Sequence, residues 1–180
     1  MKPGSVENGN PEDMPIVYLR KYTLDDMDSL VRLADNRNVS RYLAPQFPFP
    51  YTMDDARWWI ETGSCAEGAE SFVIEYMGRF AGGIGITPQK GWRNHMAEIG
   101  YWLGEDYWGR GITTAALTQM CEYAFSVCGY EKLYAPVLAP NRTSMRVLEK
   151  CGFMQEGILK HEVYRDGTYY DLYYYARYNL

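Results

Sequence analysis

The spacing of apolar and polar positions changes several times along the chain, and each change predicts a new element of secondary structure. Short segments rich in β-branched and aromatic residues predict strands over residues 15–22, 71–76, 79–88, 96–103 and 132–138. Apolar residues at helical spacing predict helices over residues 24–37, 53–63, 113–128 and 142–151. The remaining residues, 154–180, predict two strands joined by an Arg-Asp-Gly turn.

Capping residues mark the ends of two of these helices. Thr52, with Asp55 three residues later, has the pattern of a capping box at the start of the second helix. Asn141 is expected to cap the last helix, and Gly152 is expected to follow its end. A strand, a helix and a further strand in succession require a parallel crossover. The order therefore predicts a mixed sheet with helices on both faces, an α/β (α+β) fold.

Composition limits the number of domains. With 180 residues, 47% of them hydrophobic, the chain is long enough for one domain with a substantial core, expected over residues 15–180. Residues 1–14 contain almost no apolar side chains and are expected to form a disordered leader, without the apolar centre of a signal peptide. No apolar run approaches the roughly 18 residues that span a bilayer, so no membrane partner is expected.

Net charge and cysteine spacing narrow the classes of function. A formal net charge of -5 argues against general nucleic-acid binding, which needs a basic surface, and is compatible with amine ligands. The four cysteines form no Cys-x-x-Cys pair, which favours free thiols over a disulfide or a zinc site. Cys121 and Cys128 are expected on one buried helix face, and a reducing cytoplasm is the simplest location.

A glycine-rich joint connects the strand at 96–103 to the helix that follows it. The segment from Glu98 to Leu117 reads EIGYWLGEDYWGRGITTAAL. A helix that begins after such a turn presents unpaired N–H groups and the positive end of its dipole, which suit an anionic ligand. A tight turn alone is the other interpretation. No Gly-Lys-Ser or Gly-Lys-Thr follows, which disfavours a nucleotide P-loop, and the glycine spacing disfavours a dinucleotide fingerprint.

Three motifs in order resemble the GNAT superfamily of N-acetyltransferases, and in particular its branch similar to the ribosomal-protein N-terminal acetyltransferases RimJ and RimL. They are GYWLGEDYWGRGITTAAL, APNRTSMRVLEKCGF and EGILKHEVYRDGTYYDLYYYAR, and the resemblance runs from about Ile16 to the C-terminus. It implies a mostly antiparallel mixed sheet with a splayed parallel strand pair. It also implies acetyl-CoA as co-substrate, an amine acceptor, no metal, and a monomer or homodimer.

The resemblance assigns a coenzyme A site to the glycine-rich joint. The pyrophosphate is expected on the backbone amides from Gly109 to Thr114, with Arg110 adding charge. The pantetheine arm is expected to pair with the backbone of Trp102 and Leu103 in a slot between two diverging strands, and Asn141 is expected to contact the pantetheine or the amine. A closed sheet and a purely capping role for Asn141 are the alternatives. The family pattern maps onto Trp108, Gly109, Arg110, Gly111, Ile112 and Thr113, with departures at Trp108 and Thr113.

The resemblance also implies the catalytic residues, and it leaves one position open. Ser144, in an Asn-x-x-Ser pattern, is the expected acid that protonates the departing thiolate. The base of the family, a Glu on the penultimate strand, corresponds to Val163 here. Glu162 is expected to face the opposite side unless the register shifts. Glu98 is therefore the expected base, and His161 or a water chain are the alternatives.

The predicted reaction is direct transfer of the acetyl group to a primary amine in a ternary complex. The resemblance implies that Trp58, Trp59 and the loop at 47–51 line the acceptor channel, where Asp54 or Asp55 would attract the amine. The acceptor is either a protein or peptide N-terminal amine or a small-molecule amine such as a polyamine. The competing interpretations are a catalytically inactive acyl-CoA-binding regulatory module and a structural domain without a ligand.

Overall fold

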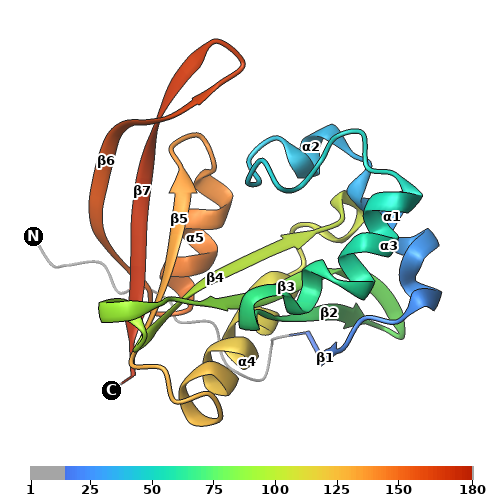
Figure 1. Cartoon of the computed structure of the whole chain (residues 1–180), viewed down its shortest axis with the longest axis horizontal. Coiled ribbons are helices and arrows are strands. Elements are labelled where there is room, and N and C mark those ends of the chain that lie inside the picture. The colour runs from blue at the N-terminus through green and yellow to red at the C-terminus, as the bar shows by residue number, and fades with distance from the viewer. Residues whose placement is uncertain (1–14, 180) are drawn as a thin grey trace, which may run out of the picture.

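The computed structural model describes residues 15–179, and a seven-stranded mixed sheet organises them (Figure 1). The strand order is β1-β2-β3-β4-β5-β7-β6, with every neighbouring pair antiparallel except β4 and β5. This confirms the predicted fold class, whereas the leader predicted at 1–14 lies outside the described residues. The strands are β1 (Val17–Arg20), β2 (Glu70–Tyr76), β3 (Arg79–Pro88), β4 (Met96–Leu103), β5 (Lys132–Leu138), β6 (Met154–Arg165) and β7 (Thr168–Tyr178).

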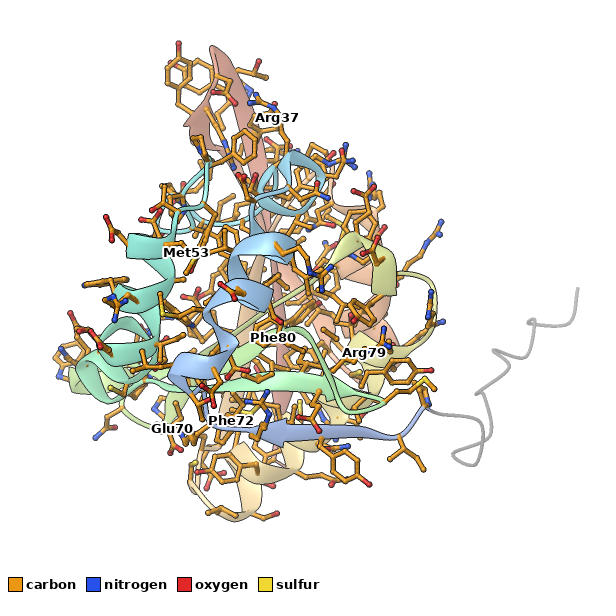
Figure 2. The ribbon with its side chains drawn as sticks, turned by 90° about the vertical axis from the view of Figure 1, so that its right-hand side faces the viewer. Arg37, Met53, Glu70, Phe72, Arg79 and Phe80 are labelled. Atoms are coloured by element: carbon orange, nitrogen blue, oxygen red, sulfur yellow. The ribbon has the colours of Figure 1, made fainter. Side chains whose placement is uncertain are left out.

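Helices cover both faces of the sheet, as the order of elements predicted. Figure 2 views the molecule from the side of α1 and α3, which lie over the strand that carries Phe80. Four 3-10 turns, at Leu24–Asp26, Gly63–Gly68, Gly91–Arg93 and Glu105–Tyr107, join the elements. No described helix is long and apolar enough to cross a membrane. The helices are α1 (Met27–Ala34), α2 (Arg37–Ser40), α3 (Met53–Glu61), α4 (Ile112–Ser126) and α5 (Arg142–Lys150).

The two faces carry separate apolar clusters because strand side chains alternate between them. On β2, Val73 packs with Leu30 of α1 and Ala56 of α3, whereas the adjacent Ile74 packs with Leu117 of α4 and Leu148 of α5. Each fully buried side chain of this size contributes about 1.5–3 kcal/mol to folding. The sheet is therefore held rigidly between two helical layers.

The predicted capping residues are confirmed, but the helix predicted over 24–37 is divided into a 3-10 turn and α1, which ends at Ala34, and the helix predicted over 53–63 ends at Glu61. The Thr52 side chain accepts from the backbone N–H of Asp55 at 3.2 Å, and the Asp55 carboxylate accepts from the Thr52 N–H at 2.8 Å. The Asn141 side chain accepts from the N–H of Ser144, and Gly152 has φ +81° just past the end of α5. The prediction that Cys128 lies on a helix face was wrong, because α4 ends at Ser126.

The parallel pair β4 and β5 diverges. Their register contains only three pairs, the last of them between Glu98 and Tyr134, and beyond it the strands run apart (Figure 1). By contrast, β5 pairs with β7 over seven positions on its other side. Residues 99–103 and 135–138 therefore border an opening in the sheet, which confirms the predicted splayed pair.

The register of β6 against β7 shifts, and this corrects the alternation assumed from the sequence. Leu159 pairs with Leu172 and Val163 with Tyr170, so three residues of β6 lie opposite Asp171. The Asp171 carboxylate holds this bulge by accepting from the His161 N–H at 3.0 Å and from Lys160 Nζ at 2.8 Å. The period of two on which the predicted facing of residues 161–163 depended is therefore interrupted here.

Candidate active site

A cavity of about 640 Å³ opens beside the diverging strands and the start of α4. We call it the donor cavity. Its lining includes the side chains or backbone of every residue predicted to bind the cofactor, together with Ser144. The structure thus brings together Trp102, Leu103, Trp108, Gly109, Arg110, Gly111, Ile112, Thr113, Thr114 and Asn141.

The glycine-rich joint shapes one wall of the donor cavity. Gly109 and Gly111 both have φ +74°, a left-handed conformation that glycine adopts without strain. A Cβ on Gly109 would meet nothing within 4 Å, so the backbone is open on that side. The N–H of Ala115 bonds to the carbonyl of Gly111 at 3.0 Å, which leaves the N–H groups of the preceding first turn free of intrahelical partners. Thr113 lies in this helical turn, where a branched side chain is tolerated.

Trp108, where the sequence departs from the family pattern, has a structural role of its own. Its indole N–H donates to the carbonyl of Leu103 at 2.8 Å, although the side chain is 43% exposed. The bond ties the glycine-rich joint to the end of β4. The Leu103 carbonyl therefore already has a donor.

The donor cavity is strongly cationic. Arg110 comes from the glycine-rich joint and Arg41 from the segment after α2, while α5 supplies three further cations. Among residues 15–179, no Asp or Glu lines it. The five cations suit a ligand with several negative charges, and they are Arg41, Arg110, Arg142, Arg146 and Lys150.

Ser144 lies where the first turn of α5 faces the opening in the sheet. Its hydroxyl is 2.9 Å from the Tyr101 hydroxyl, which also reaches the Ser144 carbonyl at 3.3 Å. Burial raises the pKa of Tyr101, so its phenol stays protonated and retains a proton to donate. The pair supplies an O–H group at the junction of β4 and α5.

A second cavity, of about 550 Å³, lies on the face of the sheet that α1 and α3 cover. We call it the acceptor cavity. Gly100 of β4 leaves space along its floor, since a Cβ there would meet nothing within 4 Å, whereas Gly83 and Gly85 of β3 let Tyr22 and Ser71 pack directly against the backbone. It shares six lining residues with the donor cavity, so the two meet there: Tyr42, Leu43, Tyr101, Trp102, Asn141 and Ser144.

Glu98 lines the acceptor cavity, on the same face of β4 as Gly100. The buried Tyr134 hydroxyl donates to its carboxylate at 3.1 Å, and the Tyr134 ring stacks on Tyr174 with centroids 5.0 Å apart. His161 and Glu162 line neither cavity, and neither does Val163, which stands at the position of the family's Glu.

Aromatic side chains form the walls of the acceptor cavity. The predicted Trp58, Trp59 and several residues of the 47–51 loop are among its lining, and Asp55 lines it whereas Asp54 does not. Sequence reasoning missed Tyr22, which follows β1 and meets Trp59 edge to face at 6.1 Å. No local pattern marks Tyr22, because its contact with the site depends on the pairing of β1 with β2.

The C-terminal hairpin of β6 and β7 is bonded to the segment after α2, which lines both cavities. Tyr42 and Leu43 line the donor and the acceptor cavity alike. Arg165, at the end of β6, donates from Nη1 to the carbonyls of Arg41 at 3.0 Å and Leu43 at 3.1 Å. The hairpin and this segment are therefore fastened to each other by side-chain to backbone bonds.

The chain is similar in sequence to known proteins. Residues 17–154 match the family model described as an acetyltransferase (GNAT) domain. YoaA of Bacillus subtilis, an uncharacterized N-acetyltransferase, is 35% identical over 79 residues, 44% of this chain and 45% of YoaA, so the chain spans less than half of that relative. The spermidine N(1)-acetyltransferase of Escherichia coli K12 is 28% identical over 162 residues, 85% of this chain and 81% of that protein.

A solved structure agrees with these matches. Mycobacterium smegmatis RimJ, in complex with CoA-disulfide, superposes with a TM-score of 0.81 at 28% identity, covering 91% of this chain and 82% of that one. The resemblance drawn from the three sequence motifs is thereby confirmed.

Proposed function

The chain belongs to the acetyltransferase (GNAT) domain family, the acetyl-CoA-dependent N-acetyltransferases, and we propose that it acetylates a primary amine by direct transfer in a ternary complex. The observation that carries the proposal is the meeting of two cavities of opposite charge at Tyr101, Trp102, Asn141 and Ser144. A donor bound on one side and an acceptor bound on the other would come into contact there.

The residues present fit acetyl-CoA, which supplies the acetyl group as a reactive thioester. The N–H groups of Ile112, Thr113 and Thr114 would hold the pyrophosphate at the positive end of α4. Five cationic side chains would balance the remaining phosphate charge. The backbone of Trp102 and Leu103 would pair with the pantetheine arm in the opening between β4 and β5.

Two proton transfers complete the proposed reaction. An ammonium has no lone pair, so Glu98 would accept a proton from the amine before or as the nitrogen attacks. The new C–N bond forms as the C–S bond breaks. Ser144, held against the Tyr101 hydroxyl, would then give its proton to the departing sulfur. The position of Glu98 in the acceptor cavity supports it over His161 as the base.

The acceptor class is open between a peptide N-terminus and a small amine, since relatives include RimJ and spermidine acetyltransferases. A thiol-release assay with acetyl-CoA and a panel of both classes, followed by mass analysis of products, tests the proposal. Release of one thiol per added acetyl group is the expected result. Binding of acetyl-CoA without thiol release, with every amine, would instead support the inactive regulatory module.

A further inference from the structure

The acceptor cavity has few charged groups. Among residues 15–179, its lining holds two carboxylates, those of Asp55 and Glu98, and no Lys, Arg or His. The Asp55 carboxylate is already used at the start of α3, where it accepts from the Thr52 N–H and the Thr52 hydroxyl. Glu98 accepts a single bond, from Tyr134, and is the less occupied of the two acids for an ammonium.

The phenols that line the cavity add no negative charge. Burial raises the pKa of Tyr22, Tyr51 and Tyr101, so all three stay neutral at physiological pH. A second ammonium inside the cavity would therefore face no carboxylate other than the one occupied at the helix cap. A buried ammonium without a partner is strongly disfavoured.

Aromatic rings contribute to the walls of the acceptor cavity, and several of them already contact one another. Phe47 meets Trp102 at 5.4 Å between centroids with an interplanar angle of 65°, and Tyr22 meets Trp59 at 88°. In each contact the face of one ring is already covered by the edge of the other, which leaves fewer free ring faces for a second cation. The open space over Gly100, two residues along β4 from Glu98, leaves room for a bulky group.

From this charge and shape, and resting on the proposed transfer function, we infer that the acceptor is a primary amine with one positive charge on a large apolar body. The ammonium would meet Glu98, and the apolar body would lie over Gly100 between the aromatic walls. Such chemistry occurs in an arylalkylamine and in a peptide that begins with a bulky apolar residue. A polyamine, with several ammonium groups, does not meet it.

A ranked set of amines tests the inference. The probes are 2-phenylethylamine, a peptide beginning with Phe, the same peptide beginning with Gly, and spermidine, each with saturating acetyl-CoA. We expect kcat/KM for 2-phenylethylamine or the Phe peptide to exceed that for spermidine by about tenfold or more. The ratio of kcat/KM for the Phe peptide to that for 2-phenylethylamine shows whether the acceptor is a peptide N-terminus or a small amine. The ratio for the Phe peptide to that for the Gly peptide measures how much the apolar side chain contributes.

The outcomes separate the inference from the proposed function. Turnover of spermidine at a rate equal to or above that of the apolar amines overturns the inference and leaves acetyl transfer standing. No thiol release with any amine overturns both.

A variant of the cavity floor gives a second measurement. Gly100→Leu would project a side chain into space that is open in the wild type, and Gly100 has no positive φ to strain it. We expect the ratio of kcat/KM for 2-phenylethylamine to that for ethylamine to fall about tenfold or more. Binding of acetyl-CoA, followed by calorimetry, reports whether the variant is folded. An unchanged ratio in the folded variant would mean that the apolar body lies elsewhere.

Discussion

The donor cavity and the acceptor cavity differ in how they present chemistry. The donor cavity is built on backbone N–H groups at the start of α4 and on five cations, three of them on α5, one in the glycine-rich joint and one after α2. The acceptor cavity is lined by residues of both sheet and helices, among them aromatic side chains and the carboxylates of Asp55 and Glu98. Opposite charges on the two sides match a polyanionic donor and a cationic acceptor.

The difference teaches where specificity resides. A backbone site at a helix start depends on chain geometry, so we expect it to tolerate side-chain changes around it, such as those at Trp108 and Thr113. A site built from side chains depends on the identity of each residue, so replacing one residue changes which ligand it binds. Four variants test this contrast, in order of the free energy expected to change.

The largest effect is expected from Glu98→Gln. The amide keeps the size of the side chain and can still accept from Tyr134, but it cannot take a proton. We expect kcat/KM to fall about 10³-fold, with the affinity for acetyl-CoA unchanged. Steady-state thiol release and calorimetry measure the two quantities. Glu131→Gln, an exposed carboxylate that lines neither cavity, is the control, and an unchanged rate and pH–rate profile in Glu98→Gln would remove Glu98 as the base.

The second-largest effect is expected from a change at the start of α1, which covers the face of the sheet where the acceptor cavity lies. Asp26, at the start of α1, is buried and accepts two bonds from Arg20, at 2.8 and 2.7 Å. Asp26→Asn removes the charge that Arg20 faces. Because Arg20 is 36% exposed, we expect a loss of about 2–3 kcal/mol in unfolding free energy rather than the larger cost of a fully buried pair. Denaturant unfolding measures it, and a loss under about 0.5 kcal/mol would contradict the assignment.

The same pair predicts a dependence on pH. Burial acts to raise the pKa of Asp26, but the bonds from Arg20 and Thr23 outweigh it, so the folded pKa lies below the unfolded value. The stabilisation is therefore fully present above the unfolded pKa of about 3.9, and it is lost as the pH falls through the lower folded pKa. The slope of stability against pH in this acid range is expected to be smaller in Asp26→Asn than in the wild type.

A smaller effect is expected from Gly109→Ala on the donor side. The added Cβ meets no neighbour, so the change reports the strain of a left-handed φ alone, about 1 kcal/mol. We expect lower thermal stability and an acetyl-CoA Kd raised about fivefold, with the acceptor KM unchanged. Gly100→Ala is the matched control for stability, since its Cβ is equally open but its φ is not positive. Equal melting temperatures for the two variants would argue against strain.

The smallest effect is expected from Arg146→Gln. Arg146 is exposed and lines only the donor cavity, so its attraction for a polyanion acts through solvent. We expect the Kd for acetyl-CoA to rise about two- to fivefold at low salt, with the difference shrinking as salt is added. Arg57→Gln on α3, which lines neither cavity, is the control. A salt-independent change would point to lost packing instead.

The sequence predicted the donor side better than the acceptor side for a physical reason. The glycines, the helix start and Asn141 act through local backbone geometry, which short motifs encode. Strands at 79–88, 96–103 and 132–138 were predicted to the residue because turns and glycines bound them. The part of Tyr22 in the site and the register shift between Leu159 and Val163 were not predicted, because strand pairing and the bonds of Asp171 decide them between residues that are separated in sequence.

The pairing of β7 with β5 has a consequence for shortening the chain. The family match ends at residue 154, where β6 begins, yet β7 bonds to β5 at seven positions from beyond that point. A protein truncated at the family boundary would leave the apolar strand β5 as a bare sheet edge, which is a template for aggregation. The hairpin of β6 and β7 therefore protects the edge of β5 from pairing with other chains. Fragments intended for expression need to retain it.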